Sequence, residues 1–496
     1  MKSTKQQYLC TVFRDPLYGY IHIPRFLCEL FIDTPIFQRL RNVEQTSMRC
    51  LFPTAHHDRF SHSLGVFFLA SKAIEYLIDV TTQKEWKSIL AAQAPYFLIA
   101  ALMHDCGHAP FSHICESFYA HAELDNELDQ LIDTDLQNDL RKRSPGIHEK
   151  VSSVVLLRGF SEKIAEALHH FSYADDDSSL HNPMMLIPRM IMGISYSEPD
   201  NQEKQIANCL ISLLNGKSID VDKLDYIMRD TWASGTSNVR IDIERILSSL
   251  FLDKPPDRPG IRLVFHKSSL SCIDSVIQGR NYLYKWLYSH HKVVYFNDIL
   301  EKTIKNLGLV CRSQTEEPNG DFLLTLFSIK AFFSPLSYAD EVFFLPADCD
   351  VRYLIKKYRN DIETADEILY RQTKFVPLWK TQEEYNYHFQ DIGEDKKIYL
   401  FSNPDHLHNA LSHVIKVDTY LRQIYAIPAK HKLTRIQKDD ILIGIREDVV
   451  QYNKIYRKKT LVHDEIEPFW YVFIPQECSK LRIDCIKALL NSSYLV

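Results

Sequence analysis

One segment constrains the fold more than any other: the longest apolar run in the chain ends in two adjacent polar side chains. Residues 94–103 carry apolar side chains at three- and four-residue spacing, which is typical of a buried helix. His104 and Asp105 follow directly. Burying an imidazole and a carboxylate together costs free energy unless something compensates for their lost hydration. A divalent cation is a natural compensator, because imidazole nitrogen and carboxylate oxygen both bind Zn, Fe, Mn and Ni.

Two further residues would complete a set of four ligands. His62 lies near the start of a second helical segment, and Asp222 lies within residues 219–226. With His104 and Asp105 they would form a site of two imidazoles and two carboxylates, open to water or phosphate. Successive residues of a helix point about 100° apart, so the adjacent pair can bind one ion only if the ion lies against that helix. The alternative at this stage is a buried His–Asp hydrogen bond without a metal.

The composition limits the remaining classes of protein. The 496 residues include only 14 glycines, which argues against a β-propeller or β-sandwich and favours a mostly α-helical chain. The net charge of −6 provides no overall basic field to attract nucleic acid or a membrane surface. Eight of the 21 histidines lie between His56 and His148, which directs the search for a site to the N-terminal helical part.

The sequence pattern predicts a helical core preceded by a short β-hairpin. Residues 9–24 alternate apolar and polar side chains around turn signals at Asp15 and Gly19. Helical spacing then predominates over residues 25–170, 182–252 and 268–307, with a strand at residues 262–266. The polar stretch at residues 121–144 is expected to be a surface insertion or an exposed helix.

The C-terminal part has a different pattern. Beyond Pro335, strand-like segments at residues 341–345, 397–401 and 470–474 mix with helices such as residues 353–357. We therefore expect a core domain at residues 1–335 and an α+β region at residues 336–496. The second region would serve oligomerisation or regulation.

Targeting signals and cysteines indicate a soluble, cytoplasmic protein, or a nuclear one in a eukaryote. The first seven residues lead into no apolar segment, so no signal peptide is expected. The longest apolar run contains Pro95 and is about half the length of a membrane-spanning helix, so no membrane contact is expected. The eleven cysteines include no CxxC pair, which is typical of reduced thiols.

Six motifs in a fixed order give the chain a family resemblance. They are residues 13–16 (FRDP), 33–41 (DTPIFQRLR), 60–66 (FSHSLGV), 104–113 (HDCGHAPFSH), 147–149 (IHE) and 222–230 (DKLDYIMRD). This succession resembles the HD-domain deoxynucleoside triphosphate (dNTP) triphosphohydrolases, the family of the SAM-and-HD-domain dNTPase of animals and its bacterial homologues. The resemblance covers about residues 8–300, is to the catalytic core alone, and implies a helical HD-domain core.

The resemblance implies a metal centre and catalytic groups. The family positions that bind a divalent metal, here Mn, Fe, Zn or Mg, correspond to His62, His104, Asp105 and Asp222. His148 matches the catalytic histidine. Glu116 stands where the family more often has an aspartate that orients this histidine, and its longer arm leaves the geometry open. His108 is a second candidate proton donor.

The resemblance also implies the substrate, a dNTP. Positions around the triphosphate and the sugar correspond to Gln45, Arg59, His113, Lys223, Tyr226, Asp230, Arg280 and Tyr288. Gln45 and Tyr288 match groups near the ribose that exclude a 2′-OH, although Tyr288 taken singly is also explained as a core aromatic. A metal lowers the pKa of bound water. Arg59, Lys223 and Arg280 would stabilise charge on phosphoryl oxygens. Attack at the α-phosphorus would release a deoxynucleoside and triphosphate.

Family members are often activated by nucleotides bound between subunits, so the resemblance implies a homo-oligomer (dimer, tetramer or higher) with a nucleotide effector. The matching effector positions are Asp33, Gln38, Arg41, Arg245, His291 and Lys292. A lysine expected near Thr11 is missing, and His266, Ser268 and Cys272 replace other expected residues, so the second effector site is altered or absent. Arg41 is equally explained by an i,i+3 pair with Glu44.

Two other functions remain open, an HD-type phosphodiesterase or nuclease and a non-catalytic nucleotide-sensing module. Gln45 and the Lys223–Tyr226 spacing favour the dNTPase over the first, and the complete ligand set weighs against the second. The basic clusters Lys430, Lys432, Arg435, Lys438 and 457–459 would touch phosphates or bind single-stranded nucleic acid, but the net charge favours solvated faces. Nucleotide-pool control and antiviral defence are both compatible with such a site.

Overall fold

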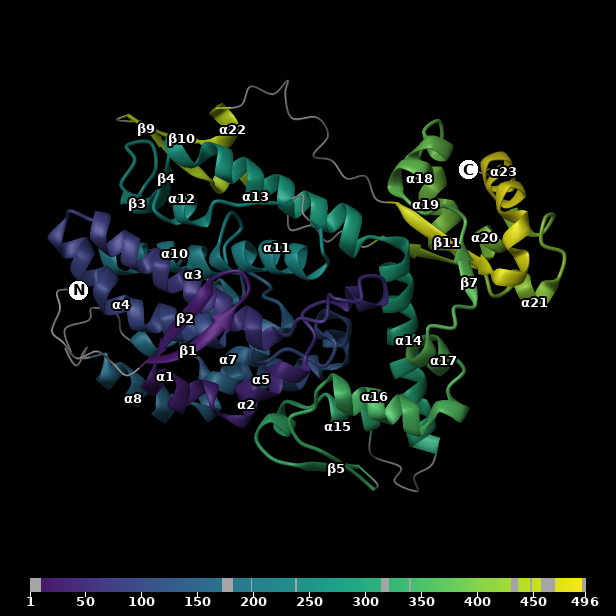
Figure 1. Cartoon of the computed structure of the whole chain (residues 1–496), viewed down its shortest axis with the longest axis horizontal. Coiled ribbons are helices and arrows are strands. Elements are labelled where there is room, and N and C mark those ends of the chain that lie inside the picture. Colours follow the sequence, from purple (N-terminus) through teal and green to yellow (C-terminus); the bar gives the residue numbers. More distant parts are fainter. Residues whose placement is uncertain are drawn as a thin grey trace.

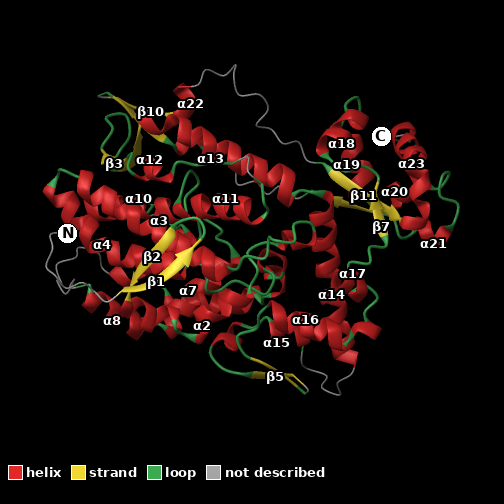
Figure 2. Ribbon diagram, in the orientation of Figure 1, coloured by secondary structure: helices red, strands yellow, loops and turns green. Residues whose placement is uncertain are grey.

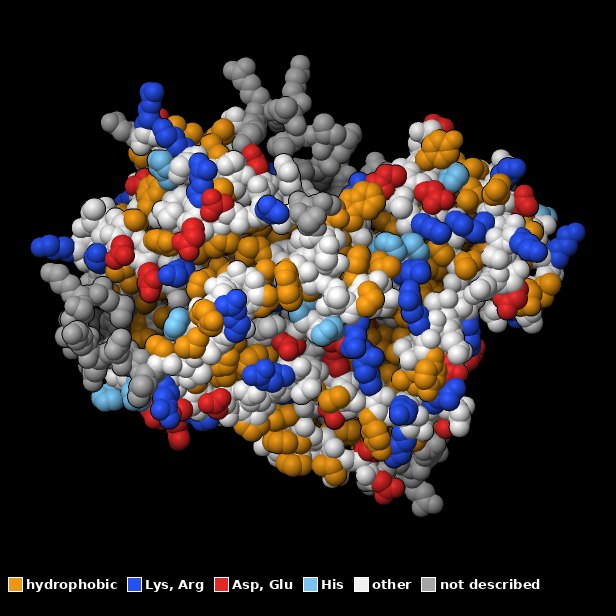
Figure 3. Space-filling model, in the orientation of Figure 1, with side chains coloured by type: hydrophobic (Ala, Val, Ile, Leu, Met, Phe, Trp, Pro, Cys, Tyr) orange, Lys and Arg blue, Asp and Glu red, His pale blue; other side chains and the backbone are white. Residues whose placement is uncertain are grey.

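The computed structural model describes residues 10–171, 182–197, 199–236, 239–313, 321–338, 340–429, 436–446, 448–455 and 469–492. Helices make up 62% of the structure, and its strands are few and short (Figure 2). The predicted fold class, mostly α with an N-terminal hairpin and a C-terminal α+β region, is confirmed. On the face drawn in Figure 3, Lys and Arg side chains are interspersed with Asp and Glu.

The described chain begins with the predicted hairpin. Strand β1 (Cys10–Asp15) pairs antiparallel with β2 (Gly19–Pro24). Asp15 closes the turn, because its Oδ1 accepts hydrogen bonds from the amides of Leu17 (2.8 Å) and Tyr18 (3.1 Å). Gly19 supplies the left-handed φ of +75° that the turn requires.

The helical core is built from six helices that pack on one another (Figure 1). They are α3 (Arg59–Val80), α4 (Lys84–Met103), α7 (Ile147–Gly159), α9 (Leu186–Met192), α10 (Gln202–Leu214) and α11 (Val221–Ala233). The other helices of this part are α1 (Arg25–Leu27), α2 (Pro35–Gln38), α5 (His121–Leu131), α6 (Thr134–Leu140), α8 (Ser161–His170) and α12 (Ile243–Leu247). The polar stretch at residues 121–144 thus includes the amphipathic helix α5, which buries only Leu124 and Leu128.

Helix α4 is long and apolar enough to cross a membrane. It lies against α3, α9 and α10, and 56% of its most apolar stretch is buried inside the protein. These contacts make α4 a core helix that ends at the His104–Asp105 pair.

The long helical run expected at residues 268–307 is divided. Helix α13 (Leu270–Tyr282) continues into a π-helical turn (Leu283–Tyr288), and α14 (His291–Ser313) then runs in a new direction (Figure 1). The preceding strands β3 (Leu250–Asp253) and β4 (Arg262–His266) form an antiparallel pair, which confirms the strand predicted at residues 262–266.

The C-terminal region contributes to two hydrophobic cores. Helix α15 (Phe322–Leu326) precedes this region. The helices of the region are α16 (Asp348–Lys357), α17 (Ala365–Tyr370), α18 (Gln382–Phe389), α19 (Glu394–Ser402), α20 (Pro404–Leu411), α21 (Asp418–Leu421), α22 (Tyr452–Ile455) and α23 (Arg482–Asn491). Its small sheets are β5 (Leu336–Tyr338) with β6 (Glu341–Phe343), and β7 (Phe375–Pro377), β11 (Trp470–Pro475) and β8 (Tyr425–Pro428). The second core lies around Trp379 and β11.

Part of this region returns to the first core. Strand β9 (Leu442–Ile445) pairs parallel with β4 and antiparallel with β10 (Asp448–Gln451), which extends the β3–β4 sheet. Side chains of α16, including Val351 and Leu354, also belong to the first core. The division at residue 335 stays a prediction, and the first core includes residues on both sides of it.

The strand expected at residues 397–401 is wrong, because this segment belongs to α19. Lys397, Leu400 and Phe401 are buried and Ile398 is exposed. Burial at three- and four-residue spacing is helical, and short apolar runs leave helix and strand ambiguous. The expected strands at residues 341–345 and 470–474 overlap β6 and β11, and the expected helix at residues 353–357 lies in α16.

Candidate active site

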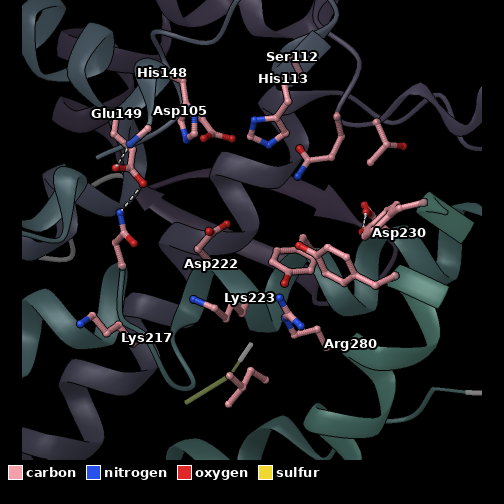
Figure 4. Close-up of a pocket in the computed structure, with 18 of the residues that line it drawn as sticks. Asp105, Ser112, His113, His148, Glu149, Lys217, Asp222, Lys223, Asp230 and Arg280 are labelled. Atoms are coloured by element: carbon pink, nitrogen blue, oxygen red, sulfur yellow. Dashed lines mark hydrogen bonds between the residues drawn. The ribbon is translucent and has the colours of Figure 1, made fainter. Parts of the chain in front are cut away.

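A cavity of about 1740 Å³ lies between the helical core and the C-terminal region (Figure 4). It is lined by α11 and α13, the ends of α3 and α4, the start of α7, and parts of α14, α18 and residues 436–439. The predicted residues that line it are Gln45, Arg59, His104, Asp105, His108, His113, His148, Asp222, Lys223, Tyr226, Asp230, Arg280 and Tyr288. His62 is fully buried.

The four predicted metal ligands converge. Helix termini position them: His62 is in the first turn of α3, the pair His104–Asp105 follows α4, and Asp222 is in the first turn of α11. His62 Nε2 lies 3.0 Å from Asp222 Oδ1, 3.3 Å from His104 Nε2 and 3.5 Å from Asp105 Oδ2. His104 Nε2 lies 3.3 Å from Asp105 Oδ1.

Neighbouring groups orient these donors. His62 Nδ1 donates a hydrogen bond to Asp225 Oδ2 (2.7 Å), and His104 Nδ1 donates to the Ala101 carbonyl (3.0 Å). Each bond fixes the tautomer and leaves Nε2 facing the other ligands. Arg59 Nη1 donates to Asp105 Oδ2 at 2.7 Å. One donor atom each of His62, His104 and Asp222 lie close enough together to hold a metal ion, and Asp105 lies beside both imidazoles. Two imidazole nitrogens and carboxylate oxygens fit a divalent metal.

The charges of the site also suit a cation. Burial opposes protonation of His62, but its hydrogen bonds to Asp222 and Asp225 outweigh this and raise its pKa to about 10. Burial likewise opposes ionisation of Asp105, yet Arg59 and His104 hold its pKa well below its usual range. The carboxylates are therefore ionised, and without a metal His62 carries a proton in its place.

A buried network behind His62 was missed by the sequence analysis. Asp225 accepts from His62, from Arg229 Nε (2.8 Å) and Nη2 (3.0 Å), and from the Tyr18 hydroxyl (2.7 Å). Arg229 Nη1 also donates to Asp15 Oδ2 at 2.9 Å, which ties the hairpin to the site. The i,i+4 spacing of Asp225 and Arg229 within the quoted motif was the available signal.

The side chains of this network come so close to α3 that only glycine fits at position 65. A Cβ on Gly65 would lie 1.9 Å from Asp225 Oδ1 and 2.5 Å from Arg229 Nη2. Gly65 therefore allows α11 to bring Asp225 next to His62.

The histidine cluster lies beside the metal ligands. Glu116 Oε1 accepts hydrogen bonds from His148 Nδ1 (2.8 Å) and His113 Nδ1 (2.9 Å), so the longer arm of glutamate does reach His148. The rings of His148 and His108 stack with centroids 4.0 Å apart. His108 Nε2 lies 3.3 Å from Asp105 Oδ1, and this contact links the cluster to the ligand set.

The two stacked histidines have different protonation states. Burial disfavours the charged form of His148, but Glu116 outweighs this and raises the pKa of His148 to about 9. Burial, Arg59 and the charge of His148 lower the pKa of His108 well below its usual value. Although burial acts against it, the charge of His148 lowers the pKa of Glu116. At neutral pH, His148 therefore carries a proton and His108 does not.

The residues expected around phosphates and sugar occupy the rest of the cavity. Lys223 Nζ donates to the Gly216 carbonyl at 2.8 Å and to Asp220. Asp230 is bonded to His57 Nε2 at 2.7 Å and to the Tyr288 hydroxyl. Three further members are Gln45, which is buried, Arg280, whose guanidinium lies 4.3 Å from the Tyr284 ring centroid, and Tyr226.

The chain is similar in sequence to several known proteins. No protein-family model matches the chain. It is 28% identical over 282 residues to the uncharacterized protein YwfO of Bacillus subtilis, covering 56% of this chain and 52% of that protein. It is 29% identical over 282 residues to the dNTP triphosphohydrolase SAMHD1 homolog of Dictyostelium discoideum (56% and 46%), and 31% identical over 246 residues to SAMHD1 of Danio rerio (48% and 35%).

The chain resembles the HD-domain dNTP triphosphohydrolases. It spans about half the length of the curated relatives it matches. A hypothetical protein from Aquifex aeolicus shares its fold with a TM-score of 0.61 and 22% identity, covering 97% of this chain and 100% of that one. A phosphohydrolase from Bacteroides thetaiotaomicron does so with a TM-score of 0.60 and 20% identity (94% and 100%).

None of the expected effector residues lines the cavity. Asp33 is exposed, and Gln38 donates to the Ile32 carbonyl at 2.8 Å. Arg245 is exposed on α12. At the start of α14, His291 is buried and 3.1 Å from the Lys380 carbonyl, and Lys292 is exposed.

The alternative explanation of Arg41, an i,i+3 pair with Glu44, is wrong. Arg41 Nε donates to Gln38 Oε1 at 2.9 Å, and its guanidinium lies 3.5 Å from the Phe60 ring centroid. Glu44 instead pairs with Arg49 at 2.8 Å. Of the basic clusters, Lys438 lines the cavity, and Lys430, Lys432, Arg435 and residues 457–459 lie outside the described residues.

Proposed function

We propose that the chain is a metal-dependent dNTP triphosphohydrolase that converts a dNTP to a deoxynucleoside and triphosphate. The observation that carries the proposal is the contact, within one cavity, between the metal ligands and the histidine cluster. The ligand set ends at Asp105, and His108, 3.3 Å away, connects it to the protonated His148. Activation of water and donation of a proton are the two requirements of phosphate ester hydrolysis. The similarity to SAMHD1 proteins supports the choice of substrate.

The protein's own residues supply proton transfer and charge stabilisation. A divalent metal, when bound to the four ligands, polarises a phosphoryl oxygen and activates water. Water adds its oxygen to the α-phosphorus and releases one proton to the solvent, and the bond from phosphorus to the 5′ oxygen breaks. His148 gives its Nε2 proton to the leaving 5′ oxygen, because Nδ1 is engaged with Glu116. The products are an uncharged deoxynucleoside and intact triphosphate.

Basic side chains bind the triphosphate in this proposal. Lys223 and Arg280 line the cavity, and each is buried or half-buried, where a charge acts more strongly on phosphate than it does in water. Gln45, Asp230 and Tyr288 bind the sugar. The hydroxyl of Tyr288 is held by Asp230, so its ring is fixed as a wall of the cavity.

Nucleotide activation, a homo-oligomeric state and a cytoplasmic location belong to the same proposal. The effector residues lie outside the cavity, which suits binding between subunits. If this is correct, mixtures of nucleotides will be hydrolysed faster than single dNTPs, and the mass in light scattering will be a multiple of the chain's 58.0 kDa.

Product analysis tests the function. The full chain is incubated with each dNTP, singly and in mixtures, with Mn²⁺ or Mg²⁺, and the products are separated by chromatography. Deoxynucleoside plus triphosphate supports the proposal, whereas monophosphate plus pyrophosphate, or cleavage of oligonucleotides only, refutes it. His104→Ala should abolish metal binding and hydrolysis. His169→Ala, an exposed histidine on α8 that does not line the cavity, is the matched control and should retain both.

A further inference from the structure

The loop that carries the catalytic motif has an unfavourable backbone. It runs from Asp105 to His113, and its side chains are buried as far as Ser112. Phe111 and Ser112 have φ angles of +56° and +52°. Two consecutive non-glycine residues in the left-handed region are uncommon, and such conformations persist only where surrounding contacts hold them. What holds this turn therefore sets the position of His113, which follows it.

Contacts from the helical core hold one side of the loop. Gly107 N–H donates to Ser152 Oγ of α7 at 2.9 Å. Ser112 Oγ donates to the Glu44 carbonyl at 2.7 Å and accepts from Arg59 Nε at 3.0 Å. None of these bonds involves the Phe111 amide.

The C-terminal region holds the other side. Asp348, which is 4% exposed, accepts a hydrogen bond from the Phe111 amide at its Oδ1 (2.6 Å) and from the Glu44 amide at its Oδ2 (3.1 Å). Beside it, Arg39 Nε donates to the Pro346 carbonyl (2.7 Å) and Arg39 Nη2 donates to the His108 carbonyl (2.6 Å). The segment at residues 346–348 is thus joined to the loop at two points, directly at the Phe111 amide and through Arg39 at the His108 carbonyl.

Asp348 is not needed to cap its own helix. It is the first residue of α16, and the capping interaction there comes from Asp350, whose Oδ2 accepts from the Ala347 amide at 2.7 Å. Both oxygens of Asp348 are instead used by residues more than 200 positions away in the sequence. A buried carboxylate with such partners is costly to keep, and burial raises the pKa of Asp348 to about 7.

We infer that Asp348 is a positioning residue for the proposed hydrolysis, an inference that rests on the proposed function. It holds the turn at Phe111 and Ser112, and through this turn it sets His113 and His108 against Glu116. The C-terminal region thereby contributes to the catalytic geometry through Asp348, without touching the substrate at that point.

The test compares Asp348→Ala and Asp348→Asn with Asp350→Ala in the full chain. Asp350→Ala is the matched control, because it removes a hydrogen bond from the same helix end without touching the loop. In Asp348→Ala we expect kcat to fall roughly 10- to 100-fold, as for other small misplacements of catalytic groups, with bound metal retained. Asp348→Asn keeps one acceptor oxygen for the Phe111 amide and should recover part of the rate. Asp350→Ala should lower the melting temperature but change kcat by less than about twofold.

Hydrogen exchange of the peptide spanning residues 105–119 gives a readout that does not depend on activity. It should become faster in Asp348→Ala and stay unchanged in Asp350→Ala. Unchanged kcat and exchange in Asp348→Ala, or equal losses in both variants, would overturn the inference. If the wild-type chain hydrolyses no dNTP, the proposed function fails, and the exchange comparison alone decides whether Asp348 holds the loop. If Asp348→Ala does not fold, Asp348→Asn carries both readouts.

Discussion

Replacing Asp225 with asparagine tests how the metal ligands are held. Asp225 is fully buried, and its two oxygens accept four hydrogen bonds, from His62, Tyr18 and twice from Arg229. An asparagine offers one acceptor oxygen and one NH₂ group. If the oxygen still accepts from His62, the NH₂ group meets the guanidinium and hydroxyl donors. If the amide is turned round, His62 must take the other tautomer, which puts its proton on Nε2 and blocks the metal.

The contacts of Asp225 set the expected losses of stability and of metal affinity in Asp225→Asn. Removing one partner of a buried ion pair costs about 3–5 kcal/mol. Because Arg229 keeps Asp15 at 2.9 Å, we expect the lower end, a loss of about 3 kcal/mol in the free energy of unfolding. Loss of the anionic partner of His62 should also weaken metal binding by about 10- to 100-fold, as for other groups that orient a metal-ligating histidine.

Asp15→Asn is the matched control. It removes the other carboxylate partner of Arg229 but does not contact His62. Urea unfolding and titration with Mn²⁺ should show comparable destabilisation in both variants, with weakened metal binding only in Asp225→Asn. Equal metal affinity in the two variants would refute the reasoning that Asp225 orients the ligand.

Gly65→Ala should lower the free energy of unfolding by about 1–3 kcal/mol in urea titration, since its Cβ would overlap Asp225; unchanged stability would contradict the contact. The rate should fall as the pH rises through about 9, where His148 loses its proton. In Glu116→Gln the fall should move to about 6.5 or below, because the charge that raises the pKa of His148 is gone and burial still lowers it. A pH profile that does not move would exclude His148 as the acid. For the same reason the stability that protonated His148 confers is complete below about pH 6.5 and is lost as the pH rises through about 9. Removal of metal with a chelator should stop hydrolysis and Mn²⁺ should restore it, whereas a rate that survives chelation would exclude the metal centre.

The parts of the fold that depend on local patterns could be predicted from the sequence. Alternation around Asp15 and Gly19 gives the hairpin, and the apolar run before His104 gives α4. The parallel pairing of β4 with β9 could not be predicted, because it joins segments about 180 residues apart and leaves no local signal. The segment at residues 397–401 was misread because a short apolar run suits a strand as well as one face of a helix.

Some residues of the candidate site could likewise be predicted from the sequence, and others could not. Its metal ligands and histidines stand in motifs, so they could be named from the sequence, and the structure brings them together around Asp105 and Glu116. Asp348 could not be found, because an aspartate at the start of a helix reads as an ordinary helix-terminal residue. Its role depends on the Phe111 amide, a backbone group that no side-chain pattern reveals.

The most direct test of the proposed chemistry follows the oxygen of water. Hydrolysis of a dNTP in ¹⁸O-labelled water, with mass spectrometry of both products, shows which atom is attacked. Attack at the α-phosphorus predicts one ¹⁸O in the triphosphate and none in the deoxynucleoside. Label in the deoxynucleoside, or products other than these two, would contradict the account.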